Sequence, residues 1–312
     1  MRVLLRIVPL LFVTSVWSQQ LERTDLDETP PTFSSEVELV LLDVSVKDSD
    51  GGFVSGLTED NFIVTENGVP QKITSFVASD APVTVGLVVD MSGSMTPKRY
   101  EVIRGAIEFV RASNPQDEVF VVNFNDSPWL GLPESTPFSF NIEELRGALS
   151  LKPPQGRTAL YDALGMGLKH LEQGRQEKKT LVVISDGGDN ASKLSFQEAL
   201  RLAQESMATI YTIGIYDLYD KDRNPGVLKD LSKATGGEAF FPKRVEEVLG
   251  VCQKIATDIR NRYTIGYVPQ HAKHDGSFRK IRVGAVAENR GKLTVRTRTG
   301  YYSPAERSAE AQ

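Results

Sequence analysis

The sequence contains very little cysteine and histidine: among 312 residues there are one cysteine, Cys252, and three histidines. A single cysteine excludes an internal disulfide and a cysteine-based zinc site. Cys252 lies among apolar residues of a helical pattern, so we predict a buried core residue rather than a reactive thiol. His170 falls in a helical pattern, and His271 and His274 fall in a late β loop. None is placed to act as the base that a nucleophilic serine needs, which disfavours a serine hydrolase.

Other absences narrow the function further. The GxxxxGK[ST] phosphate-binding loop is missing, and so is a GxGxxG motif after the first strand of the α/β pattern described below. The formal net charge of −5 gives no general attraction to nucleic acid or to an anionic membrane, so we expect no nucleic-acid partner. Beyond the N-terminus no apolar run is long enough to span a bilayer.

The N-terminus is typical of a secretory signal peptide, which we place at residues 1–18. Arg2 and Arg6 supply positive charge before an apolar stretch, IVPLLFVTSVW, and Val16 and Ser18 fit the small-residue pattern before a cleavage site. We therefore expect export to the periplasm or the cell exterior, with no transmembrane segment left after cleavage. A buried first helix or an uncleaved anchor is the alternative.

The rest of the chain changes its hydrophobic pattern several times. Residues 19–35 are polar and contain proline, which predicts a linker. Residues 36–80 and 261–304 contain short strand patterns separated by turn sequences such as DSDGG and ENGVP, which predict antiparallel β-structure. Residues 81–260 alternate apolar strands such as VTVGLVVD and KTLVVISD with helical patterns, which predicts an α/β domain with a doubly wound, mostly parallel sheet. Residues 305–312 are expected to be a flexible tail.

The two β segments are each too small to form a stable sheet alone. We predict that they pack together as one β-sandwich-like domain into which the α/β domain is inserted. Domain insertions occur where the two chain ends lie close together, as this arrangement requires.

Oxygen-bearing side chains follow the strands of the predicted α/β domain. Asp90, Ser92 and Ser94 end the first strand in DMSGSM, Asp186 follows the strand TLVVIS, and Thr158 lies in a loop that leads into a helix. Open parallel sheets bind ligands at the carboxyl ends of their strands, so we expect these side chains to meet there. Carboxylates and hydroxyls without histidine or cysteine ligands favour a hard divalent cation, Mg²⁺ or Mn²⁺.

Three motifs, DMSGSM, GRTALYDA and VVISDGGDN, resemble the von Willebrand factor type A (VWA) domain and its metal-ion-dependent adhesion site. The motif of that site is D-x-S-x-S, then a threonine, then an aspartate. It matches this chain without departure, at Asp90, Ser92, Ser94, Thr158 and Asp186. The resemblance covers residues 81–260, and the flanking segments look like those of bacterial secreted VWFA-related proteins.

We expect an exported, non-enzymatic binding or adhesion module. If the hydroxyls bind the metal directly and one acid acts through water, the metal stays electron-poor and can accept a Glu or Asp from a protein partner as its last ligand. The alternatives are an exported metal-dependent hydrolase of the phosphatase type and a structural module that uses the metal only for stability. A phosphatase typically has a second acid two residues after the first, where this chain has Ser92.

Residues near the motif have supporting or local roles in this interpretation. Asp162 lies in the first helical turn after Thr158, where an acid suits the helix dipole. It is a candidate to hold the metal ligands in place without contacting the metal itself. Asp189 and Asn190 are interpreted as turn residues.

Two further patterns are interpreted as solvated surface. Asp220, Asp222 and Asn224 resemble the start of a calcium loop, but Pro225 stands where glycine is needed. A run of basic residues alternates along the last β segment and is interpreted as the wet face of a strand rather than an anion site. Its members are Arg279, Lys280, Arg282, Arg290, Lys292, Arg296 and Arg298.

Overall fold

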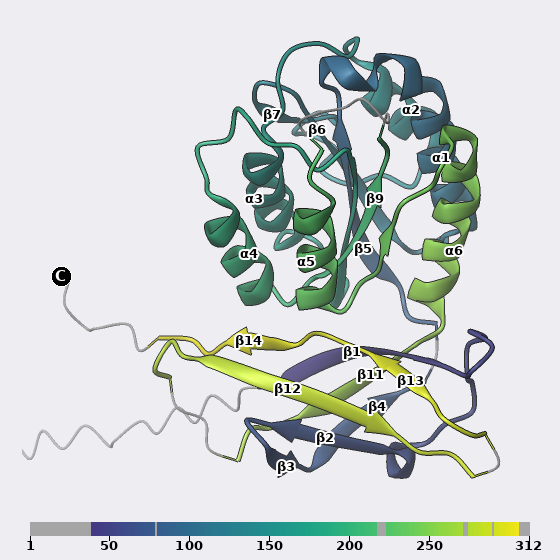
Figure 1. Ribbon diagram of the computed structural model, residues 1–312, viewed down its shortest axis with the longest axis vertical. Helices are drawn as coiled ribbons and strands as arrows, with labels where there is room; N and C mark the ends of the chain where they lie inside the picture. Colours follow the sequence, from purple (N-terminus) through teal and green to yellow (C-terminus); the bar gives the residue numbers. More distant parts are fainter. Residues whose placement is uncertain (1–38, 79, 217–222, 271–273, 289, 306–312) are drawn as a thin grey trace, which may run out of the picture. The chain divides into compact units, whose positions relative to one another are not determined.

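The structure is a computed structural model that describes residues 39–78, 80–216, 223–270, 274–288 and 290–305 (Figure 1). The predicted signal peptide and linker lie outside the described residues. So do His271, Asp220, Asp222 and all of the predicted tail except Ala305. In the described part of the chain no helix is long and apolar enough to cross a membrane.

A six-stranded sheet forms the centre of the α/β domain, with strand order β10-β9-β8-β5-β6-β7. Its strands are β5 (Val83–Asp90), β6 (Glu118–Phe124), β7 (Pro128–Leu130), β8 (Lys178–Ser185), β9 (Thr209–Gly214) and β10 (Ala239–Phe240). All neighbouring strands are parallel except β6 and β7. The central strand β5 is buried along its whole length, because helices cover both faces of the sheet.

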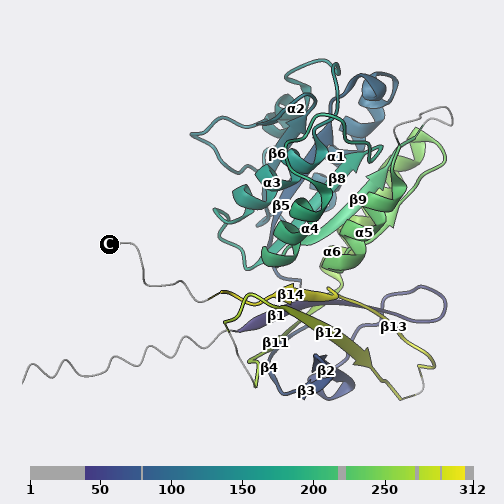
Figure 2. The same ribbon diagram turned by 60° about the vertical axis from the view of Figure 1, so that its left-hand side comes forward.

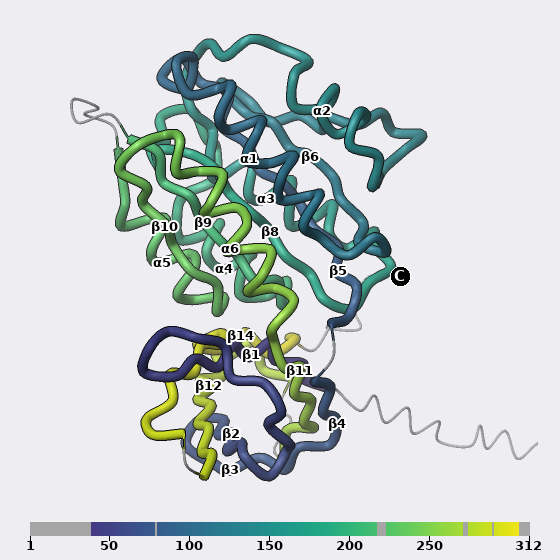
Figure 3. The backbone as a smooth tube through the Cα atoms, turned by 90° about the vertical axis from the view of Figure 1, so that its right-hand side faces the viewer, coloured from purple at the N-terminus to yellow at the C-terminus, as the bar shows by residue number. Residues whose placement is uncertain are grey.

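Helices α3, α4 and α5 cover one face of this sheet, and α1, α2 and α6 cover the other (Figures 1 and 3). Their bounds are α1 (Arg99–Ala112), α2 (Ile142–Ser150), α3 (Leu160–Leu171), α4 (Phe196–Glu205), α5 (Pro225–Thr235) and α6 (Val248–Arg260). Short 3₁₀ helices are η1 (Glu59–Asn61), η2 (Gly93–Lys98) and η3 (Val245–Glu247). Cys252 in α6 is buried in the core, as predicted.

Two four-stranded antiparallel sheets form the β-sandwich, with orders β13-β1-β11-β4 and β14-β12-β2-β3 (Figure 2). The strands are β1 (Val40–Lys47), β2 (Phe62–Glu66), β3 (Val69–Gln71), β4 (Ile73–Val77), β11 (Arg262–Tyr267), β12 (Phe278–Ala285), β13 (Thr294–Arg296) and β14 (Gly300–Tyr302). Strands from before and after the α/β domain alternate in the first sheet, where β1 pairs directly with β11, and they meet in the second sheet where β12 pairs with β2. One shared core of buried side chains fills the space between the sheets. The predicted fold class is therefore confirmed, while the residue boundaries of the domains stay predictions.

The segment KLTVRTRTGYYS forms two strands in different sheets, because β13 pairs with β1 while β14 pairs with β12. Between them Thr299 N donates to Ala234 O at 3.0 Å, and Arg298 Nη2 donates to Gln204 O at 2.9 Å. These contacts draw residues 297–299 toward α4 and α5 and break the strand.

The interpretation of the basic run as a wet face holds for only some of its members. Those that are exposed are Lys280, Arg282, Arg290 and Lys292. Arg298 is 4% exposed, and Arg296 pairs with Glu238 and Asp258. Arg296 and Arg298 are thus structural residues, because the chain here leaves the sandwich surface and packs on the α/β domain.

A buried ionic cluster joins the end of α6 to the sandwich, all within the compact unit of residues 37–312. Asp258 is 2% exposed and lies 3.0 Å from Arg262 Nη2 and 2.5 Å from Arg296 Nη2. It also accepts hydrogen bonds from the Tyr211 hydroxyl and, at 2.9 Å, from Ser45 Oγ. Burial alone would raise the pKa of Asp258, but the two guanidinium charges outweigh it and hold that pKa below its usual range.

Candidate metal centre

Asp90 is the last residue of β5, and its carboxylate is held by the end of β8 and by the loop after β5. Ser185 Oγ, at the end of β8, donates to Asp90 Oδ2 at 2.7 Å. Ser92 N donates to Asp90 Oδ1 at 2.8 Å. Asp90 is 1% exposed, so its position is fixed by buried contacts between the ends of adjacent strands.

Ser92, Ser94 and Asp186 form a hydrogen-bonded chain from the loop after β5 to the end of β8. Ser92 Oγ lies 3.1 Å from Ser94 Oγ, and Ser94 Oγ donates to Asp186 Oδ2 at 2.9 Å. Gly188 N donates to Asp186 Oδ1 at 3.0 Å. Ser94 is exposed whereas Ser92 and Asp186 are buried, so the cluster reaches solvent on the side of Ser94. These contacts bring together four of the five predicted ligands.

Thr158 is placed beside this cluster through its main chain. Thr158 N donates to Asn190 Oδ1 at 2.9 Å, and Asn190 N donates to Thr158 O at 3.0 Å. Gly93 N donates to Gly156 O at 3.2 Å, which brings the two loops into contact. Within the described residues, the Thr158 hydroxyl has no hydrogen bond to the other four predicted ligands. Its approach to them therefore rests on the loop positions.

The tight turn after β8 depends on Gly187, whose φ of +79° is readily adopted only by glycine. A Cβ there would also lie 2.5 Å from Asn224 O. Gly93 and Gly188 do not have positive φ, so among the glycines of the SGS and DGG motifs the conformational requirement falls on Gly187 alone.

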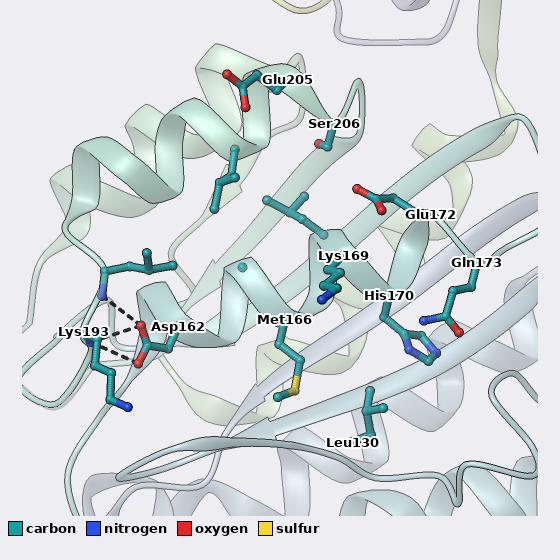
Figure 4. A pocket seen from close by; sticks show the side chains of 14 residues that line it. Leu130, Asp162, Met166, Lys169, His170, Glu172, Gln173, Lys193, Glu205 and Ser206 are labelled. Atoms are coloured by element: carbon teal, nitrogen blue, oxygen red, sulfur yellow. Dashed lines mark hydrogen bonds between the residues drawn. The ribbon is translucent and has the colours of Figure 1, made fainter. Parts of the chain in front are cut away.

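Asp162 does not contact the predicted ligands. Its carboxylate accepts hydrogen bonds from Lys193 N at 3.1 and 3.0 Å and from Leu194 N at 2.9 Å, as Figure 4 shows. These contacts brace the loop that follows Asp186. They lie at one end of a groove lined by α3 and α4, which is separate from the candidate centre.

Three residues that position the site were not identified as such from the sequence. Ser185 holds Asp90, and Asn190 holds the backbone of Thr158. Asp189 Oδ2 accepts a hydrogen bond from Tyr161 N at 3.1 Å, at the start of α3. The polar run SDGGDN was the available signal for Asp189 and Asn190, since such residues commonly accept hydrogen bonds from nearby main chain.

Two buried carboxylates give the centre its electrostatic character. Burial, followed by the charge of Asp186, raises the pKa of Asp90 to about 6, although hydrogen bonds from Ser92 and Ser185 oppose the shift. In the described part of the chain no group of three or more His, Cys, Asp and Glu side chains could hold a metal. The predicted donor set consists of two acids with neutral hydroxyls, which would fit a hard cation that keeps several waters.

Comparison with known proteins gives a family match for part of the chain. Residues 85–188 match the family described as the von Willebrand factor type A domain, and this range contains all five predicted ligands. This part of the chain is therefore similar to a VWA domain.

Individual relatives are distant. The chain is 27% identical over 139 residues to an uncharacterized protein of Borreliella burgdorferi, and the match spans 41% of this chain and 39% of that relative. Among solved structures it is similar to a von Willebrand factor type A protein from Catenulispora acidiphila, with 11% identity, a TM-score of 0.52, and coverage of 88% of this chain and 76% of the other. It is also similar to the vWF domain of the type V pili tip protein Mfa5 from Porphyromonas gingivalis. That match has 16% identity and a TM-score of 0.49, and it covers 58% of this chain and 96% of the other. At these identities the Catenulispora structure supports the fold alone.

Proposed function

We propose that this protein is an exported binding module that holds Mg²⁺ or Mn²⁺ and uses the ion to bind a protein partner. The predicted ligands are Asp90, Ser92, Ser94, Thr158 and Asp186. The observation that carries the proposal is the chain of oxygen atoms from Ser92 through Ser94 to Asp186, beside Asp90, at the ends of two adjacent strands. A bound dication would supply a positive centre for an anionic oxygen of the partner.

The side chains in this arrangement have distinct roles. Asp90 and Asp186 provide the negative charge that attracts the cation, and a cation between them would relieve the repulsion that raises the pKa of Asp90. Ser92, Ser94 and Thr158 provide neutral oxygens and add no charge. The ion is thereby left able to accept a Glu or Asp carboxylate, and the exposed edge at Ser94 is where that carboxylate would enter.

Binding is favoured over catalysis because VWA domains are typically non-catalytic adhesion modules. The phosphatase alternative predicts hydrolysis of a generic phosphate ester that depends on Asp90, and our proposal predicts none. The purely structural alternative predicts that Mg²⁺ raises the melting temperature without affecting any partner, whereas we expect both effects.

The experiment that tests the proposal compares partner binding with and without free metal. Proteins from envelope and secreted fractions would be captured in Mg²⁺, and the affinity of a recovered partner would be measured in Mg²⁺, in EDTA and after Mg²⁺ is restored. We expect EDTA to abolish binding and Mg²⁺ or Mn²⁺ to restore it. Thr158→Ala should weaken the interaction by about ten- to a hundredfold while leaving the fold intact, as loss of a group that orders a metal site does.

The matched control is Thr257→Ala, which removes an exposed hydroxyl on α6 that donates to Gln253 O. It should leave partner affinity unchanged. The partner's key acid, replaced by its amide, should lose far more affinity than its neighbours do. A partner that binds equally well in excess EDTA would refute the metal-mediated mechanism.

A further inference from the structure

Three loops meet beside the candidate metal centre and are joined by main-chain hydrogen bonds. They are the loops that follow β5 and β6 and the loop that leads into α3. Met91 N donates to Phe124 O at 2.7 Å, and Gln155 N donates to Met91 O at 2.8 Å. Gly93 N donates to Gly156 O at 3.2 Å. The backbone around the metal centre is therefore fixed on the β6 side.

Arg157 projects from this joined backbone and is anchored by Asp126. Asp126 Oδ1 accepts hydrogen bonds from Arg157 N at 3.3 Å and from Arg157 Nε at 3.1 Å. The next residue but one, Ala159, donates its N–H to Asn125 O at 2.7 Å. Among the described residues the two terminal nitrogens of Arg157 have no hydrogen-bond partner, and its side chain is 66% exposed. The inner edge of the guanidinium is thus held while its outer edge faces solvent.

Gly156 lets this anchor form. Its φ is +80°, and a Cβ built there would lie 2.1 Å from Asp126 Oδ2. A residue with a Cβ at this position would force the Asp126 carboxylate to shift from the place where it holds Arg157. Gly156 and Gly93, which are joined by a main-chain hydrogen bond, place no side chain between Arg157 and the loop after β5.

We propose that Arg157 is a specificity residue that binds a second acidic group of the partner, beside the carboxylate donated to the metal. This inference rests on the proposed function. Arg157 precedes Thr158, and consecutive Cα atoms are about 3.8 Å apart, so both contacts fall on one short stretch of the partner. A guanidinium presents paired N–H groups that match a carboxylate, and the Asp126 anchor lowers the entropy lost when it binds one. The favoured ligand is an extended peptide with two acids within about four residues of each other, since a strand advances about 3.3 Å per residue.

The test is selection of random displayed peptides on the full-length protein in Mg²⁺, with elution by EDTA. The variants are Arg157→Ala and a matched control, Arg175→Ala. The Arg175 side chain is 91% exposed, and its Nε lies 3.8 Å from Glu118 Oε1. Mg²⁺ titration of each protein checks that the metal centre is intact. We expect the wild type and Arg175→Ala to enrich peptides with two nearby acids, and Arg157→Ala to enrich peptides with a single acid.

A selected two-acid peptide should bind Arg157→Ala about two- to fivefold more weakly than the wild type, as expected for an exposed charged pair. Replacing the second acid by its amide should weaken binding to the wild type by the same factor and leave binding to Arg157→Ala unchanged. Equal affinity of both proteins for the peptide, or selection of no acidic peptide by a protein that binds Mg²⁺, would overturn the role of Arg157. A wild type that takes up no Mg²⁺ would overturn the proposed function and this inference with it.

Discussion

Replacing Asp258 by alanine is expected to lower the free energy of unfolding by about 3–5 kcal/mol, the range for removing one partner of a buried ion pair. Asp258 is the shared acceptor of Arg262, Arg296, Tyr211 and Ser45. Without it, two guanidinium groups stay near each other with no carboxylate between them, and Arg262 is itself only 4% exposed. Urea unfolding followed by circular dichroism measures the effect.

The control for Asp258 is an exposed ion pair of the same type. Glu143→Ala removes the partner of Arg146, at 3.7 Å and with side chains 74% and 47% exposed. It should cost less than about 1 kcal/mol, because exposed pairs contribute little. A loss for Asp258→Ala no larger than that of Glu143→Ala would show that the cluster does not stabilise the junction.

Asp90→Asn is expected to stabilise the metal-free protein while removing its response to metal. The pKa of Asp90 is raised from 3.8 to about 6, so at neutral pH the ionised carboxylate disfavours the folded state. Each pKa unit corresponds to about 1.4 kcal/mol, so the variant in EDTA should be about 1–3 kcal/mol more stable than the wild type at pH 7. The amide keeps the contacts, since its oxygen still accepts from Ser92 N and its nitrogen can donate to Ser185 Oγ.

Addition of Mg²⁺ should reverse this order. At a thousandfold excess over the dissociation constant the wild type gains about 4.1 kcal/mol, more than the variant's advantage in EDTA, and the variant gains nothing. In EDTA, the contribution of Asp90 to the stability of the folded state should fall as the pH rises. Because the folded wild type binds the Asp90 proton more tightly than the unfolded chain, this contribution is fully present below about pH 4 and is lost as the pH rises through about 6. Asp90→Asn should lack this component.

Asp230→Asn, which changes an exposed acid on α5, controls for the change in net charge. It should change neither the stability in EDTA nor the stabilisation by Mg²⁺. Thermal melts across pH in EDTA and in Mg²⁺ provide both measurements. A variant that is less stable than the wild type in EDTA, or that Mg²⁺ stabilises as strongly, would contradict the assignment of Asp90.

The parts of the fold that could be predicted are those with a strong local pattern. Residues 83–90 were predicted as a strand with the bounds that β5 has, because strands buried on both faces are continuously apolar. The short strands β3, β7 and β10 were missed, since two or three residues carry no period. The Asp258 cluster could not be foreseen, because Ser45 and Asp258 are 213 residues apart and only the folded chain brings them together.

Some residues of the candidate site could also be predicted from the sequence, and others could not. Asp90, Ser92, Ser94 and Asp186 could be placed together because each follows a strand of one parallel sheet. Ser185 was overlooked because it continues an apolar strand and looks like part of the core. Arg157 was overlooked because its significance lies in the contact with Asp126, 31 residues earlier in the chain.

The measurement that tests the central claim most directly is calorimetric titration of Mn²⁺ and Mg²⁺ into the wild type and into Asp90→Ala. We predict one site per wild-type chain, with Mn²⁺ bound more tightly than Mg²⁺ as the divalent series requires, and no binding to Asp90→Ala. Undiminished binding to Asp90→Ala, or no binding to the wild type, would contradict the account.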